Sequence, residues 1–295
     1  MKNSTLLDRA YEKLKEYREI KLKKEHIQDS PIPKIIHQQG KSLNDIPYHF
    51  KMYMDGFKTM NPEHTHLLWT NDDLEAFVQR EYPQFYDLYM SLPMPVLQAD
   101  LARYFLLNTF GGIYSDMDTQ SLKSFKEWPA TDFDRFHSQV IVGIEVDTFR
   151  PDWEEWFARS LQFCQWTMAT VPHHPITESI IAESTKKLSK MLQQNKGHEI
   201  DAFNNQISIL NSTGPGIWTD CVFKYIDPAI PTGRDAVLRN LKHPVMIRNV
   251  TVLPITGFSP GQHVMGSEDY GHPEAKVAHL FNGGWKKVEH RNIHG

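Results

Sequence analysis

Two glycines, an apolar pair and two aspartates follow one another in the run Gly111-Gly112-Ile113-Tyr114-Ser115-Asp116-Met117-Asp118. Glycine ends helices at little steric cost, so the glycine pair predicts the end of the segment before it. Ile113-Tyr114 then predicts a short buried strand. Ligands of open α/β sheets bind beyond the carboxyl ends of the strands. The run therefore predicts an α/β fold in which Asp116 and Asp118 leave a strand at the ligand-binding edge.

The segment before the glycines, residues 95–108, predicts a helix. Its apolar residues fall on or near one buried face, and they are Leu97, Leu101, Phe105 and Leu106. Asp100 and Arg103 lie three residues apart, so they share one face of the helix and can reach the same ligand. With the two aspartates they form an ordered set. The alternative is an exposed helix ion pair followed by an acidic turn.

Strands and helices alternate on the N-terminal side of this run. The sequence predicts a strand at 33–38, a helix at 48–60, a second strand at 66–69 and a helix through Phe77. This cadence is typical of parallel βαβ units. We therefore expect a Rossmann-like, mostly parallel central sheet flanked by helices. Further along the chain, residues 141–146 predict a strand.

Two more helices are predicted at 153–168 and 176–194. The chain has 295 residues and is 40% hydrophobic, which is enough for one large α/β core. Apolar residues recur every three or four positions from Ser4 to about Glu25, which predicts an amphipathic helix. We expect residues 1–28 to contain that helix and residues 29–295 to form a single catalytic domain.

The bulk composition limits the possible partners. A formal net charge of −4 gives no basic footprint for a nucleic-acid partner. No apolar run approaches the roughly 18 residues of a spanning helix, and Met1 is followed by polar residues. We therefore expect a soluble chain with no membrane span and no leader. Cys164 and Cys221 are too few for a disulfide scaffold, and they are either free thiols or one bridge.

Two carboxylates at a strand end suit a divalent cation that neutralises a diphosphate. Arg103 could add charge-assisted hydrogen bonds to phosphate or sugar hydroxyls. A second Asp-x-Asp pattern occurs at Asp132-Phe133-Asp134, in a stretch that predicts a solvated loop. A polar turn is therefore the alternative for Asp116 and Asp118 when they are taken without their surroundings.

Three further features have two interpretations each. Thr213-Gly214-Pro215-Gly216 predicts a tight loop, which either lets backbone approach a ligand or is an ordinary turn. Glu145 and Asp147 share one face of a strand, and they either meet an acceptor or mark an ordinary strand end. Trp166, predicted on a helix, is more often a core residue than a platform for a sugar.

As a set, these segments resemble glycosyltransferase family 32, over about residues 31–288. The segments that carry the resemblance are 32–38, 61–62 with Trp69, 99–104 and 111–119. Three more segments, 162–167, 213–216 and 252–256, resemble the fungal α-1,6-mannosyltransferases that initiate outer-chain growth on N-glycans. The resemblance implies a GT-A-type fold and a retaining, metal-dependent α-mannosyltransferase, with α-1,6 linkage and a location in the Golgi lumen.

The resemblance also implies the ligands and their residues. The donor would be GDP-mannose, the cofactor Mn²⁺ and the acceptor an N-glycan or mannan-type oligosaccharide. Asp118 would bind the metal and Asp116 the metal or the donor ribose, while Asp100 and Arg103 would hold the donor sugar. His279 matches the C-terminal histidine that completes the metal shell in such enzymes. Without the family, His279 would be read as a surface or core histidine.

Further donor-binding positions are implied outside the metal shell. They are His37, Gln38, Tyr104, Gly214, Gly216, Trp285 and Lys286, together with Asp100, Arg103 and Asp116. Lys286 would neutralise phosphate or remain a solvated tail charge. The chain has Gly283-Gly284-Trp285 where the family pattern has Gly-Ser-Trp, which removes a hydroxyl that could contact phosphate.

Two other functions fit the same residues. One is a non-catalytic sugar-nucleotide- or glycan-binding subunit of a mannosyltransferase complex. The intact set Asp100, Arg103, Asp116, Asp118 and His279 argues against it. The other is a family enzyme with another donor or a lipid acceptor. The sequence identifies no carboxylate nucleophile, so we expect front-face attack, in which the leaving diphosphate takes the acceptor's proton.

Overall fold

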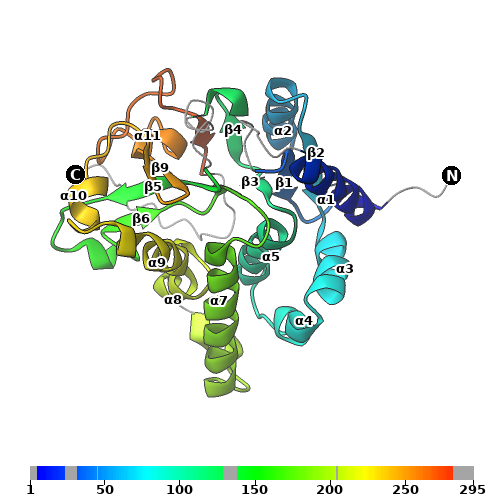
Figure 1. Cartoon of the computed structure of the whole chain (residues 1–295). Coiled ribbons are helices and arrows are strands. Elements are labelled where there is room, and N and C mark those ends of the chain that lie inside the picture. The colour runs from blue at the N-terminus through cyan, green and yellow to red at the C-terminus, as the bar shows by residue number, and fades with distance from the viewer. Residues whose placement is uncertain (1–4, 24–31, 45, 129–137, 204, 282–295) are drawn as a thin grey trace.

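The structure, a computed structural model, describes residues 5–23, 32–44, 46–128, 138–203 and 205–281. A mixed β-sheet lies between two layers of other elements (Figure 1). Its strands, in spatial order, are β2 (Thr65–Trp69), β1 (Ile35–Gln39), β3 (Gly112–Ser115), β7 (Thr167–Thr170), β5 (Val140–Asp147), β9 (Val250–Leu253) and β8 (Val245–Ile247). Strand β6 (Leu161–Phe163) pairs with β5 beside this path.

Most strands of this sheet run in one direction. Strand β1 is parallel to β2 and to β3, and β5 is parallel to β9. Strand β7 is antiparallel to both of its neighbours, β3 and β5, so it is the reversed strand at the centre of the sheet. The predicted α/β class, with a mostly parallel central sheet flanked by helices, is confirmed. A second, two-stranded antiparallel sheet consists of β4 (Thr119–Ser121) and β10 (Val277–His279).

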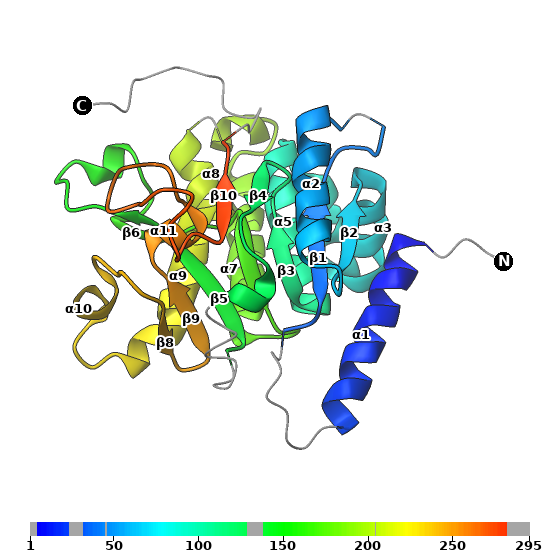
Figure 2. The same cartoon turned by 90° about the horizontal axis from the view of Figure 1, so that it is seen from above.

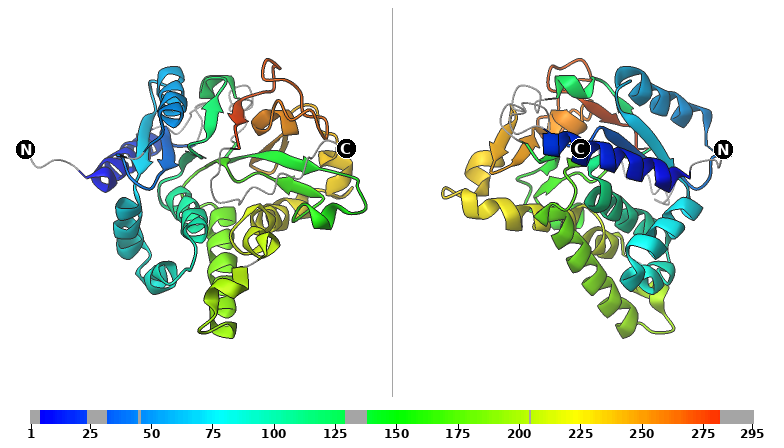
Figure 3. Two further views of the ribbon diagram at one scale, coloured as in Figure 1. Left: turned by 180° about the vertical axis from the view of Figure 1, so that it is seen from behind. Right: turned by 45° about the vertical axis from the view of Figure 1, so that its right-hand side comes forward.

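Helices cover the sheet unequally. The lower face in Figure 1 carries α3 (Asn71–Glu81), α4 (Pro83–Met90), α5 (Pro95–Phe110), α7 (Pro175–Gln194), α8 (Gln206–Ser212) and α9 (Pro215–Ile226). The upper face carries α2 (Tyr48–Met60), α11 (Ile255–Phe258) and the β4–β10 pair, and the views of Figure 3 show the same layers. The short helical elements are α10 (Arg234–Leu238) and 3-10 turns at Phe125–Glu127, Trp153–Glu155, Glu199–Phe203 and Asp227–Ala229.

Alternate residues of the strands enter two separate hydrophobic cores. In β1, Ile35 belongs to the larger core and Ile36 to the smaller one. In β5, Val140 and Val142 enter the larger core, while Ile141 enters the smaller one. Successive side chains of a strand point to opposite faces. Because both faces are covered, these strands consist of continuous apolar residues, as expected for a buried sheet.

The predicted N-terminal helix is confirmed as α1 (Leu6–Lys23), which lies beside β2 in Figure 2. Ala10 and Leu14 are buried in the larger core. The ring of Tyr11 meets Phe110 of α5 edge-on, with 5.2 Å between ring centroids. The division of the chain after residue 28 stays a prediction. Within the described residues, no helix has the length and apolar character that a membrane crossing requires.

Helix α5 is buried over most of its length and delivers the chain to β3. Pro95 occupies its first turn, where the missing N–H costs nothing. Gly111, with φ 62°, ends it, and the Gly111 N–H donates to the Leu107 carbonyl at 2.9 Å. Gly112 has φ 95°, and a Cβ there would lie 2.6 Å from the Ile35 carbonyl oxygen. Glycine therefore lets β3 pack directly against β1.

The predicted helix at 153–168 is wrong. Only Trp153–Glu155 forms a 3-10 turn, and strands β6 and β7 follow. Pairing with β5 and β3 buries Phe163 and Met168 in the larger core, so long-range pairing overrides the local pattern. Trp166 consequently lies in the connection between β6 and β7. The helix predicted at 176–194 is confirmed as α7.

The predicted tight loop at 213–216 is partly wrong. Gly214 is the N-cap of α9, and Pro215 and Gly216 form its first turn, because proline is favoured at that position. Cys164 and Cys221 are both buried free thiols. The second Asp-x-Asp pattern, at 132–134, lies outside the described residues.

Candidate active site

Asp116 and Asp118 lie in the turn between β3 and β4, at the carboxyl end of β3. Hydrogen bonds hold this turn on both sides. The Asp116 N–H donates to the Trp166 carbonyl at 2.8 Å, and the Thr119 N–H donates to the Asp116 carbonyl at 3.2 Å. The side chain of Asp116 is 26% exposed and that of Asp118 is 11% exposed. Both carboxylates are therefore available at the edge of the sheet but largely shielded from water.

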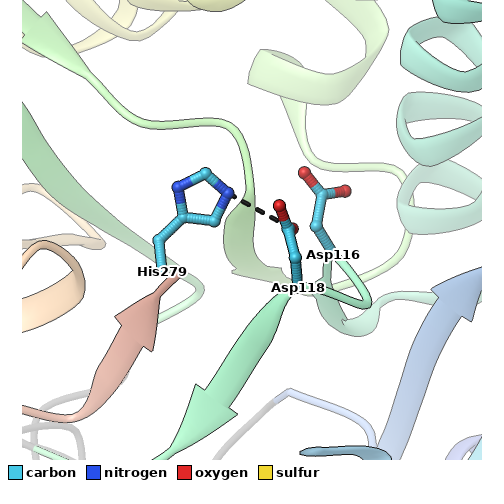
Figure 4. A group of neighbouring side chains, drawn as sticks. All are labelled: Asp116, Asp118 and His279. Carbon is cyan, nitrogen blue, oxygen red and sulfur yellow. Dashed lines mark ion pairs between the residues drawn. The ribbon is translucent and has the colours of Figure 1, made fainter. Parts of the chain in front are cut away.

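Strand β10 brings His279 to the two aspartates. It pairs with β4 so that His279 lies opposite Thr119, and the Leu280 N–H donates to the Asp118 carbonyl at 2.9 Å. His279 Nε2 lies 3.2 Å from Asp118 Oδ1, and Figure 4 shows the three side chains converging. One ligand atom from each of Asp116, Asp118 and His279 lies within 4.8 Å of the other two. The residues form a candidate metal centre.

The donor set of this cluster fits a divalent cation. Burial raises the pKa of Asp116, the Arg103 charge opposes that rise, and the nearby Asp118 carboxylate adds to it. A bound cation would offset both the loss of hydration and the repulsion between the carboxylates. An imidazole nitrogen beside carboxylate oxygens suits a transition-metal ion better than Mg²⁺, which prefers oxygen ligands.

Arg103 joins the metal cluster to helix α5. One of its terminal nitrogens lies 2.9 Å from Asp100 Oδ1 and 3.6 Å from Asp116 Oδ1. The other terminal nitrogen donates to the Gln165 carbonyl at 3.0 Å, and the guanidinium lies over the ring of Tyr114. Its Nε has no hydrogen-bond partner among the described residues. Arg103 therefore brings a fixed, buried positive charge to the edge of the site, with one N–H left over.

Asp100 anchors that arginine from within the core, and its side chain is only 2% exposed. Its Oδ2 accepts a hydrogen bond from the Thr213 hydroxyl at 2.8 Å, and its Oδ1 accepts one from Gln165 Nε2 at 3.1 Å. Burial raises the pKa of Asp100 to about 6, and the Arg103 charge opposes the rise. Both carboxylate oxygens are thus engaged inside the protein.

Three of the predicted donor-binding residues have their polar atoms engaged within the protein. His37 Nε2 donates to the Gly111 carbonyl at 2.9 Å, and its Nδ1 accepts from Trp69 Nε1 at 3.0 Å. Gln38 Nε2 donates to the Asp116 carbonyl at 3.2 Å, and its Oε1 contacts His66 Nε2 at 2.6 Å. His37 therefore supports the fold, and Gln38 supports the turn that carries the aspartates; a direct contact of either residue with a donor stays a prediction.

Tyr104 is the third of them, and it is fully buried. Its hydroxyl lies 2.6 Å from Gln165 Oε1 and 2.8 Å from the Thr213 carbonyl. Thr213 also donates to Asp100, so Tyr104 and Asp100 hold the same residue at the start of α9. A direct contact of Tyr104 with a donor stays a prediction.

The glycines at the start of α9 allow close packing. A Cβ at Gly216 would lie 2.7 Å from Ala158 Cβ, and a Cβ at Gly214 would lie 2.6 Å from Leu210 Cα. These contacts account for both glycines without a ligand, so their donor-binding role stays a prediction. Trp285 and Lys286, with Gly283-Gly284, lie outside the described residues.

The two acidic residues near the end of β5 have different surroundings. Asp147 is 7% exposed, and its carboxylate lies 3.0 Å from a terminal nitrogen of Arg239. It stabilises the end of the strand. Glu145 is half-buried and accepts a hydrogen bond from Gln162 Nε2 at 3.0 Å, where the pairing of β5 with β6 shifts register. An acceptor contact for Glu145 stays a prediction.

Two residues of the site were missed in the sequence. The Tyr114 hydroxyl donates to Asp116 Oδ1 at 2.6 Å, and Gln165 contacts Asp100, Arg103 and Tyr104. Strand alternation could have found Tyr114, because it precedes Asp116 by two positions. Segment 162–167 contributes to the family resemblance, but its helical pattern gives no indication that Gln165 contacts Asp100 and Arg103.

Comparison with known proteins identifies the class. A family described as "Glycosyltransferase sugar-binding region containing DXD motif" matches residues 47–134, which include Asp100, Arg103 and both aspartates of the turn. The chain is 36% identical over 260 residues to the initiation-specific alpha-1,6-mannosyltransferase of Schizosaccharomyces pombe, covering 86% of this chain and 64% of that protein. The sheet and its acidic turn are those of a glycosyltransferase.

The Candida albicans initiation-specific alpha-1,6-mannosyltransferase is 33% identical over 293 residues, covering 88% of this chain and 73% of the relative. The chain belongs to the family of these mannosyltransferases. A mannosyl phosphorylinositol ceramide synthase of Saccharomyces cerevisiae, CSH1, is 42% identical over 214 residues, covering 72% of this chain and 47% of that protein. The solved PaToxG glycosyltransferase has a TM-score of 0.49 at 15% identity, covering 77% of this chain and 84% of that one.

Proposed function

We propose that this chain is a retaining, Mn²⁺-dependent mannosyltransferase that moves mannose from GDP-mannose to an N-glycan or mannan-type acceptor in α-1,6 linkage, in the Golgi lumen. One observation supports it above the others. Asp116, Asp118 and His279 converge within 4.8 Å beside Arg103, in a chain related to initiation-specific alpha-1,6-mannosyltransferases. The complete cluster argues against a non-catalytic subunit.

Asp116, Asp118 and His279 would hold the metal ion. A bound Mn²⁺ would supply Lewis-acid stabilisation to the diphosphate oxygens. The His279 nitrogen favours Mn²⁺ over Mg²⁺ for this role. The relation to mannosyltransferases supports mannose as the transferred sugar, whereas guanine recognition is carried over from the family resemblance alone.

Arg103, in addition to the metal ion, would bind the donor diphosphate. Its guanidinium is already charged, buried and oriented by Asp100 and by the Gln165 carbonyl. An oriented cation next to the leaving diphosphate stabilises the charge that develops there without rearrangement during the reaction. The N–H at Nε has no partner among the described residues but is buried, so Arg103 would act on the donor through its charge rather than through that N–H. Asp100 acts as the residue that orients Arg103.

The engaged carboxylate of Asp100 favours front-face transfer over a covalent intermediate. A double displacement needs a carboxylate that reaches the anomeric carbon, but both Asp100 oxygens accept hydrogen bonds within the protein. In the front-face route, the acceptor hydroxyl oxygen bonds to the anomeric carbon as the bond to the diphosphate oxygen breaks. The hydroxyl proton passes to that leaving diphosphate oxygen, so retention requires no protein nucleophile.

A lipid acceptor is the second candidate. The support for it is the 42% identity to a protein named mannosyl phosphorylinositol ceramide synthase, over 72% of this chain. Both candidates use the same donor half of the site. The two candidate functions differ only in the acceptor molecule whose hydroxyl attacks the anomeric carbon, so an assay with both acceptors separates them.

The test is donor hydrolysis by the purified chain across a panel of sugar nucleotides, with and without Mn²⁺, followed by transfer to two acceptors. We expect hydrolysis of GDP-mannose with Mn²⁺ and transfer to an oligomannose N-glycan. Transfer only to an inositol phosphoceramide would establish the second candidate. Equal hydrolysis without divalent metal, or preference for another sugar nucleotide, would overturn the donor or the metal assignment.

A further inference from the structure

Trp166 contacts two of the three residues of the candidate metal centre, Asp116 and His279, although it is not a candidate ligand itself. Its carbonyl oxygen accepts the Asp116 N–H at 2.8 Å. Its indole ring stacks on the imidazole of His279, with 4.4 Å between ring centroids and 7° between the ring planes. Trp166 is only 7% exposed. Trp166 therefore holds Asp116 through its backbone carbonyl and His279 through its buried side chain.

The indole is itself fixed by other contacts. Trp166 Nε1 donates to the Phe258 carbonyl in α11 at 3.0 Å. The ring of Phe281 meets both Trp166 and His279 edge-on, at 5.7 Å and 4.1 Å between centroids. The rotation of the indole is thus set before a metal binds. The indole can act as a rigid wall for the imidazole.

The imidazole lacks the support that a metal-binding histidine usually has. Such a histidine normally donates its second ring N–H to a carbonyl, a carboxylate or water, which fixes the ring orientation. His279 Nδ1 is buried and has no hydrogen-bond partner among the described residues. The stacked indole supplies orientation by shape instead of by a hydrogen bond. Its π-face also favours positive charge on the ring that covers it, as a metal-bound imidazole carries.

We infer that Trp166 is the positioning residue of the metal centre: its ring sets the orientation in which His279 presents Nε2 to Asp116 and Asp118. The inference rests on the metal-dependent function proposed above. Groups that orient metal ligands contribute about 10–100-fold in metal affinity. We expect a loss of that size when the flat ring is removed.

The test measures Mn²⁺ binding to the full chain without donor, by the electron paramagnetic resonance signal of free Mn²⁺. Trp166→Leu keeps an apolar side chain and removes the flat face, so the dissociation constant should rise about 10–100-fold. Trp166→Phe keeps an aromatic face and loses the bond to Phe258, so its loss should be smaller. In a His279→Ala background, neither change should weaken binding further, because the ring that Trp166 orients is gone.

Thermal unfolding without metal establishes that each variant is folded. If Trp166→Leu does not fold, Trp166→Phe provides the same comparison between the two backgrounds. Equal losses with and without His279, or no loss in either, would overturn the positioning role while leaving the metal centre intact. A wild-type chain that does not bind Mn²⁺ at all would remove the metal centre, and this inference would fall with it. The two failures are therefore distinguishable.

Discussion

Asp118 reaches two partners that come from the far end of the sequence. Its carbonyl accepts the Leu280 N–H at 2.9 Å, and its Oδ1 lies 3.2 Å from His279 Nε2. The backbone contact aligns β10 with β4, and the side-chain contact brings together two atoms that could bind one metal ion. The geometry of the cluster thus depends on strand pairing as well as on the side chains themselves.

Replacing Asp118 with Ala should abolish transfer while leaving the fold intact. Changes one step away from a metal cost about 10–100-fold, so loss of a direct ligand should cost more than a hundredfold in kcat/KM. The measurement is transfer at saturating Mn²⁺, with circular dichroism as the check on folding. Gln120→Ala, at an exposed position in β4, is the matched control and should retain activity. Near-wild-type activity of Asp118→Ala would remove the metal assignment.

His279→Ala should weaken Mn²⁺ binding, with partial rescue of activity at high Mn²⁺. If His279 and Asp118 bind one ion, the double variant should lose less than the sum of the two single losses, since each change removes part of the same interaction. Titration of Mn²⁺ against the four proteins of this cycle measures the coupling. Additive losses would mean that the two residues belong to separate sites.

At the scale of elements, the parts of the fold with local signals were predictable. Strands β1 and β2, with helices α2 and α5, follow from apolar periodicity and from the glycines and prolines that bound them. Strands β6 and β7 did not follow, because the segment 161–170 mixes glutamines with aromatic residues and its pairing partners lie far away. The reversed strand at the centre of the sheet is a property of the whole sheet and leaves no local pattern.

The candidate site divides in the same way. Asp100 and Arg103 lie in α5, and the two aspartates follow β3, which comes directly after that helix. A single run of sequence therefore places the four residues together. His279 was reached only through the family resemblance, since β10 pairs with β4 across more than half of the chain. Nothing in the local sequence around Gln165 and Trp166 could indicate that their carbonyls hold Arg103 and Asp116.

Gly112→Ala should destabilise the junction between α5 and β3. The residue has φ 95°, which costs an alanine about 1–2 kcal/mol, and its Cβ would lie 2.6 Å from the Ile35 carbonyl oxygen. We expect a loss of at least about 2 kcal/mol in the free energy of unfolding, measured by urea denaturation. Gly56→Ala in α2 is the control: open space surrounds that position, and stability should rise by about 0.5–1 kcal/mol. Similar effects of both changes would contradict this account of Gly112.

Across the described residues, several buried or half-buried histidines have a lowered pKa. Burial lowers the pKa of His37, His64, His66 and His174 to about 4 in each case. The contacts of His37 also favour its neutral form. Its Nδ1 accepts a hydrogen bond from Trp69 Nε1, and a protonated Nδ1 would lose that bond and face the Trp69 N–H as a second donor. Burial raises the pKa of Asp100, so its effect on stability has the opposite sign: this carboxyl takes up a proton first in the folded protein and favours folding as the pH falls.

The free energy of unfolding should therefore fall as the pH drops from about 6.5 toward 4. A histidine whose folded pKa is lowered contributes its full stability above its unfolded pKa and loses it as the pH falls toward the folded value. For His37, a shift from 6.5 to about 4 corresponds to about 3 kcal/mol. Urea unfolding at pH 7, 6 and 5 measures the slope. His37→Gln keeps a donor and an acceptor without a titrating group, so its slope should be shallower; an unchanged slope would exclude His37 as a source.

The pairing of β10 with β4 also orders events during biosynthesis. A ribosome-bound chain that has released residues through β9 carries every strand of the main sheet, yet it holds only two members of the metal cluster. Translation proceeds at about 5–20 residues per second and delivers the N-terminal residues first. The nascent protein therefore passes through an interval in which the strands of the main sheet can pair, while the smaller core still lacks Phe258 and Val277 and the candidate metal centre still lacks His279. Arrival of β10, the final described strand, adds the third member of the candidate metal centre.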